Sequence, residues 1–480
     1  MTTARKPLHF NAFVMNTNSH INHGQWRRPD AQQTEFNDVN TWIELAKLLE
    51  DAKFDAMFFA DVSGHYGDAD ADYEVYVRHG LQIPSNDPTV LLGALAVVTE
   101  NIGLALTSNV MQNHPFNFAR QVSTLDHISN GRIAWNIVTG TQDNGARNYG
   151  LPKLTDPGER YRWAEEYVDV TYKLWEGSWD EGALLKDKEQ GLYSDPSKVH
   201  KIYHEGARYR VEGPHLPSPS PQRTPLLFQA GSSGSGLAFA ARNAEAVFII
   251  SPTPEAAGAQ IAETRRLAVE AGRNADDIKF FPGLSFIIGD TEEEAQEKAR
   301  EYDKYVSVEG FLAHSALVDS DGRVYDPETP IKDVDTNTTK GFLEWAAIAI
   351  PDREPTLGDL VRQRANINRV VGTPEQIADE LERWQDAGVD GINVINWVIP
   401  GSFAEFADKV LPVLRERGLA QKEYAPGTLR EKLFGQPRLN ERHPAAAYRG
   451  AFAGGPTTWD EADEQRRAEA STEAVVVNAQ

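Results

Sequence analysis

The sequence contains no cysteine among its 480 residues. Disulfide bonds, thiolate nucleophiles and cysteine metal ligands are therefore excluded, and the composition suits a reducing compartment. Positive charge is also scarce, because 48 Lys and Arg residues against 71 Asp and Glu residues leave a net charge of −23. Such a chain repels phosphate backbones and anionic lipids, so we expect neither nucleic acid nor a membrane among its partners.

Long hydrophobic runs are missing as well. No uninterrupted apolar stretch is long enough to span a bilayer, and the opening residues "MTTARKPLHF" lack the apolar centre of a signal peptide. We therefore expect a cytoplasmic protein. Hydrophobic residues still make up 40% of the chain, which is enough to bury a sizeable core.

What the chain does have is a regular alternation of short apolar segments and amphipathic helical segments. The strand-like segments are 8–14, 55–61, 102–110, 133–140, 225–231, 246–252, 278–289 and 391–398. Continuous apolar strands of this kind are typical of parallel sheets that are buried on both faces. About eight strand–helix units predict an α/β fold, a (β/α)8 TIM barrel. An open doubly wound sheet is the alternative, but no G-x-G-x-x-G follows the first strand.

The alternation predicts a single barrel domain over residues 1–452. It is interrupted by polar insertions at about 62–86, 180–222 and 308–370. Extra material after barrel strands builds the rim of the active site, so we expect these insertions there. Residues 453–480 form an acidic polar tail, which we expect to be poorly ordered on its own.

Polar side chains gather where the predicted strands end, which is where barrels carry their functional groups. They are Asn16, Thr17, His20, Asp61, Tyr66, Thr107, Asn136, Thr139, Gly231, Ser232, Ser233 and Trp397. Hydroxyls, amides and aromatic rings dominate this set, and carboxylates are rare. His20 is the candidate general acid or base, because an ordinary histidine titrates near neutrality.

The rarity of carboxylates limits the chemistry. Glycoside hydrolysis needs a pair of carboxylates, and metal hydrolases need several histidine and carboxylate ligands. His20 and His23 leave a metal pair as the weaker alternative, and we expect no metal. No G-x-S-x-G motif is present. A polar, mostly uncharged pocket suits a planar organic cofactor that carries the difficult chemistry itself.

The stretch "QAGSSGSG" indicates a phosphate site. A strand delivers Ser232 and Ser233 to a helix N-terminus, where free N–H groups and the helix dipole favour an anion. Arg160 and Tyr161 open another helix and are candidates for the same phosphate. The alternatives are an ordinary helix cap or linker for the serines, surface pairing with glutamates for Arg160, and core-edge packing for Tyr161.

Several motifs together resemble the bacterial luciferase-like monooxygenases. They include "SHINHGQWR", "FDAMFFAD", "STLDHISNGRIAWNIVTG", "ERYRWAEEY" and "TPEQIADELERW". Within that family the chain is most similar to the nitrilotriacetate, dibenzothiophene-sulfone, dimethyl-sulfide and long-chain alkane monooxygenases. The resemblance extends to about Phe452.

The resemblance implies a TIM barrel that receives reduced FMN from a separate NAD(P)H-dependent flavin reductase. With O2 as co-substrate, a flavin peroxide would oxidise or cleave a small organic substrate. The residues implied around FMN are Asp61, Thr107, Asn136, Thr139, Arg160, Tyr161, Gly231, Ser232 and Ser233. Thr107 and Asn136 would flank the ring and the oxygen site, where their hydrogen bonds stabilise developing negative charge. A homo-oligomer, either dimer or tetramer, is also implied.

The substrate stays open at this point. Asn16, Thr17, Tyr66, Gln82, His314 and Trp397 are the candidates for the substrate side. Thr17 stands where the alkane-type enzyme carries cysteine, and Gly140 widens the space near the flavin, so substrate chemistry does not transfer. Riboflavin, cleaved to lumichrome, and halogenated or sulfur-containing aromatics are alternative substrates. Alternatives of another class are a coenzyme F420-dependent oxidoreductase and a non-catalytic flavin-binding barrel.

Overall fold

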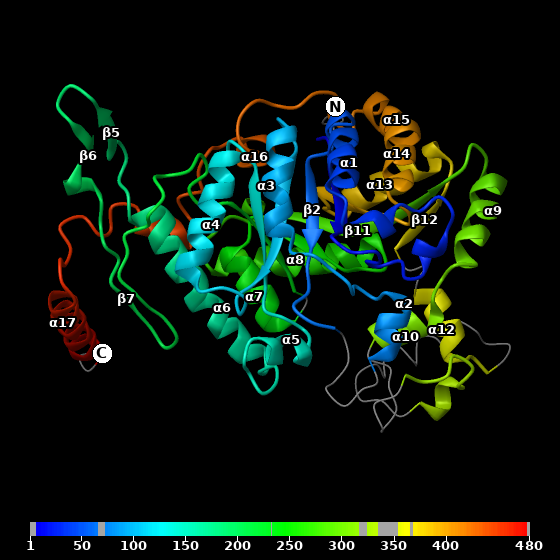
Figure 1. Cartoon of the computed structure of the whole chain (residues 1–480), viewed down its shortest axis with the longest axis horizontal. Coiled ribbons are helices and arrows are strands. Elements are labelled where there is room, and N and C mark those ends of the chain that lie inside the picture. Colours follow the sequence, from blue (N-terminus) through cyan, green and yellow to red (C-terminus); the bar gives the residue numbers. More distant parts are fainter. Residues whose placement is uncertain are drawn as a thin grey trace.

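The computed structural model describes residues 6–65, 73–231, 233–315, 324–334, 354–364 and 368–477. In this part of the chain, eight parallel strands form a closed barrel, which confirms the predicted fold (Figure 1). The barrel strands are β1 (His9–Met15), β2 (Ala56–Ala60), β3 (Gly103–Asn109), β4 (Ile133–Val138), β9 (Leu226–Ala230), β10 (Ala246–Ile249), β11 (Lys279–Ile288) and β13 (Gly391–Ile395). Strand β11 closes the ring by pairing with β10 and β13.

Helices surround the barrel. The main ones are α1 (Val39–Asp51), α3 (Pro88–Val98), α4 (Pro115–Ile128), α5 (Asp143–Asn148), α6 (Pro157–Tyr172), α7 (Gly234–Asn243), α8 (Pro254–Glu270), α9 (Glu292–Asp303), α13 (Pro374–Asp386), α14 (Gly401–Glu405) and α15 (Leu411–Glu416). Local sequence explains where they start. Asp87 accepts a hydrogen bond from the Thr89 amide at 2.7 Å, and Pro88 occupies the first turn of α3.

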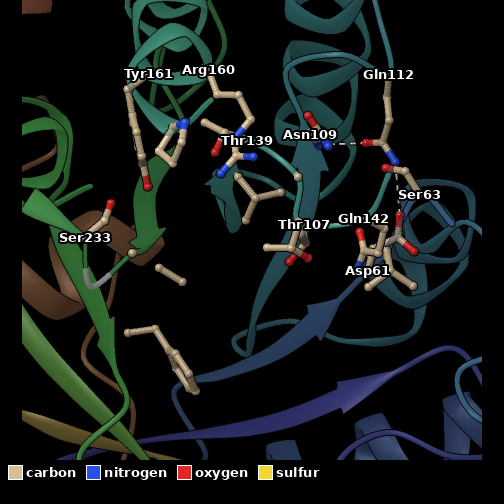
Figure 2. Close-up of a pocket in the computed structure, with 18 of the residues that line it drawn as sticks. Asp61, Ser63, Thr107, Asn109, Gln112, Thr139, Gln142, Arg160, Tyr161 and Ser233 are labelled. Carbon is tan, nitrogen blue, oxygen red and sulfur yellow. Dashed lines mark hydrogen bonds between the residues drawn. The ribbon is translucent and has the colours of Figure 1, made fainter. Parts of the chain in front are cut away.

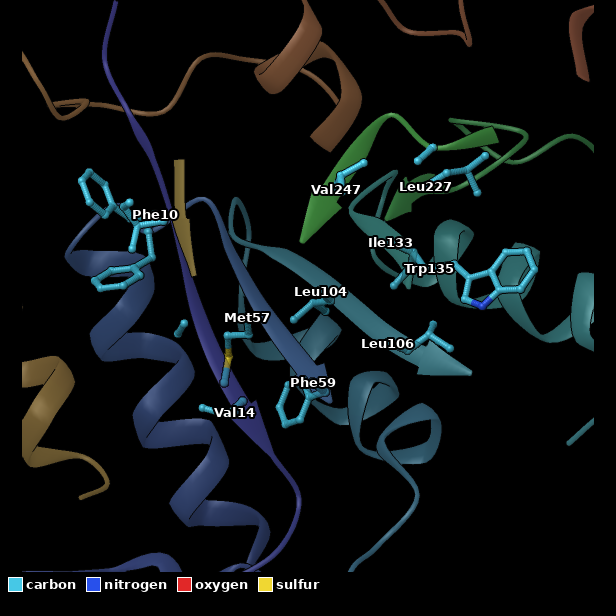
Figure 3. Packing of buried hydrophobic residues seen from close by; sticks show 14 of the residues in the cluster. Phe10, Val14, Met57, Phe59, Leu104, Leu106, Ile133, Trp135, Leu227 and Val247 are labelled. Atoms are coloured by element: carbon cyan, nitrogen blue, oxygen red, sulfur yellow. The ribbon is translucent and has the colours of Figure 1, made fainter. Parts of the chain in front are cut away.

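The strands divide their side chains between two cores. Met57 and Leu104 point outward to the helices (Figure 3), whereas Phe58 and Ala105 point into the barrel. This alternation follows from the two-residue period of a strand. The inner core is closed at the amino ends of the strands by the short helix α16 (Leu429–Phe434), whose leucines join the interior cluster.

Two of the three insertions lie beside one another. Residues 62–86 contain α2 (Glu74–His79), and residues 308–370 contain α10 (Val308–His314) and α12 (Leu357–Arg364). The Tyr76 hydroxyl donates to the Ala313 carbonyl at 2.8 Å, and Figure 1 shows these helices together. The first segment directly follows β2, whereas the second follows α9 and reaches the rim where it contacts α2.

The third insertion, 180–222, begins after a helix rather than after a barrel strand. It forms two hairpins, β5 (Leu184–Asp187) with β6 (Leu192–Ser194) and β7 (His204–Glu205) with β8 (Arg210–Val211). It follows the π-helical turn η3 (Lys173–Gly177) and precedes β9. Its second hairpin packs beside the carboxyl ends of the strands: the Tyr209 ring lies 5.3 Å from His114, which caps α4 after β3, and the Tyr209 hydroxyl accepts from Trp163 Nε1 at 2.6 Å.

The acidic tail contains a helix, α17 (Trp459–Val477), beside the hairpins (Figure 1). The Trp459 ring contacts Tyr203 with ring centres 5.1 Å apart, and Arg210 lies 3.7 Å over its face. A short strand that the pattern did not reveal, β12 (Arg369–Gly372), pairs with β11 outside the barrel. Among the described helices, none is long and apolar enough to cross a membrane.

Candidate cofactor site at the barrel mouth

A cavity of about 400 Å³ opens at the carboxyl ends of β2, β3, β4, β9 and β10. The predicted cofactor residues that line it are Asp61, Thr107, Thr139, Arg160, Tyr161, Gly231 and Ser233. Of the described lining residues, Asp61 is the one acid and Arg160 the one base. Figure 2 shows Tyr161 and Ser233 across the cavity from Asp61 and Gln112. The cavity therefore has two chemically different ends.

One end is built on the N-terminus of α7. Ser233 caps this helix by accepting from the Gly236 amide at 3.1 Å, and its hydroxyl also hydrogen-bonds with Tyr161. The Tyr161 hydroxyl accepts from Gln229 Nε2 at 3.3 Å. A Cβ atom at Gly231 would come within 2.5 Å of that hydroxyl, so glycine keeps the backbone close to the cavity. Ser232 lies outside the described residues.

Arg160 supplies the positive charge at this end. One Nη donates to the Thr155 carbonyl at 3.0 Å, but the buried Nε–H has no hydrogen-bond partner. Burial lowers the pKa of Arg160 from its usual value. The predicted alternative, surface pairing with glutamates, does not occur among the described residues. An unpaired guanidinium N–H beside a helix N-terminus fits an anionic group such as a phosphate.

The other end carries Thr107 and Asn136. The register of β3 and β4 places the two residues opposite each other, and Asn136 Nδ2 donates to Thr107 Oγ1 at 2.9 Å. The Thr107 hydroxyl hydrogen is therefore available to a ligand in the cavity. Asn136 Oδ1 is buried without a hydrogen-bond partner among the described residues. Asn136 does not line the cavity itself but contacts Thr107, which does.

Asp61 is held by a residue that sequence reasoning missed. Gln112 Nε2 donates to Asp61 Oδ2 at 3.3 Å, and Gln112 Oε1 accepts from the Asn109 amide at 2.7 Å and from the Ser108 hydroxyl at 3.1 Å. These two acceptor contacts fix which end of the Gln112 amide faces the carboxyl. Burial is the main cause that raises the pKa of Asp61 to about 7.

The strand-end pattern also points to Ser63 and Asn109, which line the cavity, whereas the other missed lining residues include Gln142, Phe248 and Gln260. Asn109 ends β3 and so carried the same strand-end signal as Thr107. Gln112 and Gln142 lie in loops, where no periodic pattern points to the cavity. Their positions depend on how the loops fold back over the strands.

The predicted substrate residues lie mostly on a neighbouring part of the rim. Thr17, His20 and Trp397 line a separate space of about 10 Å³. Gln82 Nε2 donates to the His20 carbonyl at 3.1 Å, and the Thr17 hydroxyl donates to the Pro84 carbonyl at 2.7 Å. Asn16 is buried at the end of β1. Tyr66 lies outside the described residues.

Burial lowers the pKa of two rim histidines, His20 and His23. Burial, with a smaller contribution from His314, lowers the pKa of His20 to about 3. Its general acid or base role stays a prediction, with the imidazole uncharged at neutral pH. The His314 ring lies 4.7 Å from that of His23, so it faces the loop after β1. Among the described residues, no cluster of three or more histidines or carboxylates is arranged to hold a metal ion.

These features define a TIM-barrel protein with a polar cavity at the carboxyl ends of its strands, with Arg160 at one end and Asp61 and Thr107 at the other. Residues 13–391 match the model of a family described as "Luciferase-like monooxygenase". The chain belongs to this family, and the protein is a flavin-dependent monooxygenase.

Three relatives are similar over most of their length. The long-chain alkane monooxygenase of Geobacillus thermodenitrificans is 42% identical, covering 92% of this chain and 98% of the relative. The dimethyl-sulfide monooxygenase of Hyphomicrobium sulfonivorans is 42% identical, covering 94% and 95%. A riboflavin lyase, solved with modified FMN and riboflavin, is 37% identical with a TM-score of 0.82, covering 92% and 100%.

Proposed function

We propose that the protein is the oxygenase component of a two-component system. It takes reduced FMN from a separate NAD(P)H-dependent flavin reductase and, with O2, oxidises or cleaves a small organic substrate. The observation that carries this proposal is the unpaired Arg160 Nε–H beside Ser233 and Tyr161, at the opposite end of the cavity from Thr107. The relative solved with modified FMN supports the choice of flavin.

The phosphate end favours FMN over riboflavin. A phosphate accepts hydrogen bonds from the Arg160 guanidinium, from the Ser233 hydroxyl and from the N–H groups that begin α7, and the helix dipole adds to the attraction. Riboflavin has no phosphate to make these contacts. The cavity volume of about 400 Å³ lies in the range of single small-molecule sites.

Residues of the chain then donate hydrogen bonds, transfer protons and exclude water in the cavity. Reduced flavin, when bound, supplies the electrons that activate O2. Thr107 donates its hydroxyl hydrogen toward the ring end, and Asn136 holds that hydroxyl in place. Asp61 can give or take a proton near neutral pH. Apolar side chains such as Val138 and Phe248 exclude water from the same space.

An anaerobic titration tests the assignment of the cofactor. We expect reduced FMN to bind more tightly than reduced riboflavin, by about tenfold or more, because only FMN engages the anion end. Equal affinity for the two, or no binding of either, would contradict the proposal. Hydride transfer with coenzyme F420 in the absence of oxygen would instead support the alternative oxidoreductase.

A second measurement separates an enzyme from a flavin-binding barrel. The FMN-loaded protein is mixed with a flavin reductase, NADH, air and a panel of alkanes, sulfides, sulfones, haloaromatics and riboflavin. We expect at least one compound to give an oxidised product in an amount that depends on the protein. Flavin binding without product from any compound would favour the non-catalytic alternative.

A further inference from the structure

A group of polar side chains at the barrel mouth lies beside the cofactor cavity, and we call it the rim cluster: Asn16, His20, Asn396 and Trp397. Met15 pairs with Ala60 in the register of β1 and β2. The next residues, Asn16 and Asp61, therefore end neighbouring strands, which lie about 4.8 Å apart. The rim cluster thus borders the cofactor cavity along the strand order of the barrel.

Every member of the rim cluster carries a buried polar atom that has no hydrogen-bond partner among the described residues. These atoms are Asn16 Oδ1, His20 Nδ1, Asn396 Oδ1 and Trp397 Nε1. Buried polar groups in folded proteins are nearly always paired, and unpaired ones destabilise the fold. Three of the four residues line the same small space. Such a concentration indicates a ligand rather than core packing.

The backbone around the rim cluster is firmly held. Asn22 Nδ2 donates to the Asn396 carbonyl at 2.8 Å, and Gln33 Nε2 donates to the Trp397 carbonyl at 3.0 Å. These contacts use backbone atoms and leave the side-chain polar atoms of Asn396 and Trp397 open. Neighbouring residues therefore fix the backbone of the rim cluster but leave its side-chain polar atoms without hydrogen bonds, as expected of a binding site.

The chemistry of the open atoms selects the ligand group. The two amide oxygens only accept, so they require an O–H or N–H donor. The indole N–H only donates, and a hydroxyl oxygen can accept it. Of the described residues that line the space, none carries a formal charge, since burial keeps His20 neutral. The space of about 10 Å³ matches one oxygen or nitrogen group rather than a whole substrate.

An apolar wall connects the rim cluster to the cofactor cavity. The Phe13 ring lies 4.6 Å from the His20 ring and 5.0 Å from the ring of Phe248, which lines the cofactor cavity. A ligand with its polar end at the rim cluster would lay its body along Phe13. That path leads into the cofactor cavity at Phe248, which lies on β10.

We propose that the rim cluster binds a neutral hydroxyl or N–H group at one end of the organic substrate, whose apolar body lies along Phe13 toward the cofactor. This assignment rests on the proposed function and names its substrate class: uncharged molecules with an apolar body and a donor-bearing end. Plain alkanes, simple sulfides and polycarboxylates fall outside the class.

Matched ligand pairs test the assignment by equilibrium binding to the FMN-loaded protein. The pairs are dodecanol with dodecane, methylthioethanol with ethyl methyl sulfide, and riboflavin with lumiflavin. We expect the hydroxyl-bearing member of at least one pair to bind about tenfold more tightly or better, because its partner leaves the buried atoms unpaired. Equal affinities within the pairs, or no binding by any hydroxyl-bearing member, would overturn the assignment.

The variant Asn396→Leu provides a readout besides binding. The Asn396 side chain makes no hydrogen bond among the described residues, so leucine of similar size removes only the unpaired amide. We expect the preference within the pairs to disappear and the melting temperature to rise. The control Gln33→Leu should lower the melting temperature, because both ends of the Gln33 amide are bonded, to the Trp397 carbonyl and the Ile399 amide.

The outcomes separate this assignment from the proposed function. A fall in melting temperature for Asn396→Leu, or a pair preference that survives it, would overturn the rim assignment. Tight binding of reduced FMN, with turnover of dodecane or ethyl methyl sulfide equal to that of the hydroxyl partner, would also overturn it and leave the proposed function standing. Failure of reduced FMN to bind would instead contradict the proposed function.

Discussion

Two groups of buried polar side chains, one at each end of the barrel, differ in how completely they are hydrogen-bonded. At the amino end, α16 carries the fully buried Arg430, which donates to both oxygens of Glu245 and to the carbonyls of Gln222, Thr224 and Pro225. At the carboxyl end, Arg160, Asn136, Asn396 and Trp397 each keep a buried polar atom without a partner in the described chain.

The fully bonded group at the amino end contributes to stability, whereas the incompletely bonded group at the carboxyl end is suited to binding a ligand. A buried charge whose hydrogen bonds are complete holds the amino end of the barrel closed. Open hydrogen-bonding atoms at the carboxyl end cost stability, and they persist where a ligand completes them. The same rule holds in barrels generally, where the carboxyl face carries catalysis and the amino face carries stability.

The largest effect on stability is expected from removing the buried ion pair between Arg430 and Glu245 at the amino end of the barrel. Arg430→Met leaves Glu245 as a buried charge without its partner, so we expect a loss of about 3–5 kcal/mol in unfolding free energy. Chemical unfolding followed by fluorescence measures it. Arg266→Met is the control, since Arg266 pairs with Glu263 and Glu270 on an exposed helix surface and should lose under about 1 kcal/mol. Similar losses for both would contradict a special role for Arg430.

Asp61 should make stability depend on pH. Its carboxyl has a pKa of about 7 in the folded chain against the ordinary 3.8, so the folded state holds the proton more tightly. This contribution is present at low pH and is lost as the pH rises through 7. Relative to Asp61→Asn, the natural protein should lose on the order of 2–4 kcal/mol between pH 4 and pH 8. Melting curves across this range measure the difference, and a constant difference would refute it.

Replacing Arg160 should weaken the binding of reduced FMN without affecting the stability of the fold. We expect Arg160→Gln to raise the dissociation constant of reduced FMN about 10-fold to 100-fold, because a charge-assisted contact to the phosphate is lost. Riboflavin binding should stay the same. Arg162→Gln is the matched control on α6, since Arg162 is exposed and pairs with Glu159. An equal effect on FMN from both variants would exclude a direct phosphate contact.

The smallest effect is expected from Thr107→Val, which removes one hydroxyl at nearly constant volume. The loss of its hydrogen bond should lower kcat/KM about tenfold while FMN binding changes little. Thr107→Ser, which keeps the hydroxyl, should retain most of the activity. Steady-state oxygen uptake with a turned-over substrate measures both. Equal losses in the two variants would show that the methyl group matters rather than the hydroxyl.

Much of the fold could be read from local patterns. Asp87 and Pro88 begin a helix by local capping, which needs no tertiary contact. The alternation of apolar strands with helices predicts a barrel. Thr107, Asp61 and Ser233 could be found because barrels bring strand ends together. The hairpins of 180–222 were not predicted, because such short strands in a polar insertion carry no clear periodic signal.

The sequence by itself determined the closed barrel, the place of Ser233 and Arg160 in the cavity wall, and the family, since each depends on periodicity, capping or a contiguous motif. Only the tertiary structure decided how the loops fold back. It brought Gln112 to Asp61, raised the pKa of that carboxyl, and left His20, Asn396 and Trp397 with unpaired atoms around one small space. Burial and pairing arise between residues far apart in the chain, so no local pattern reports them.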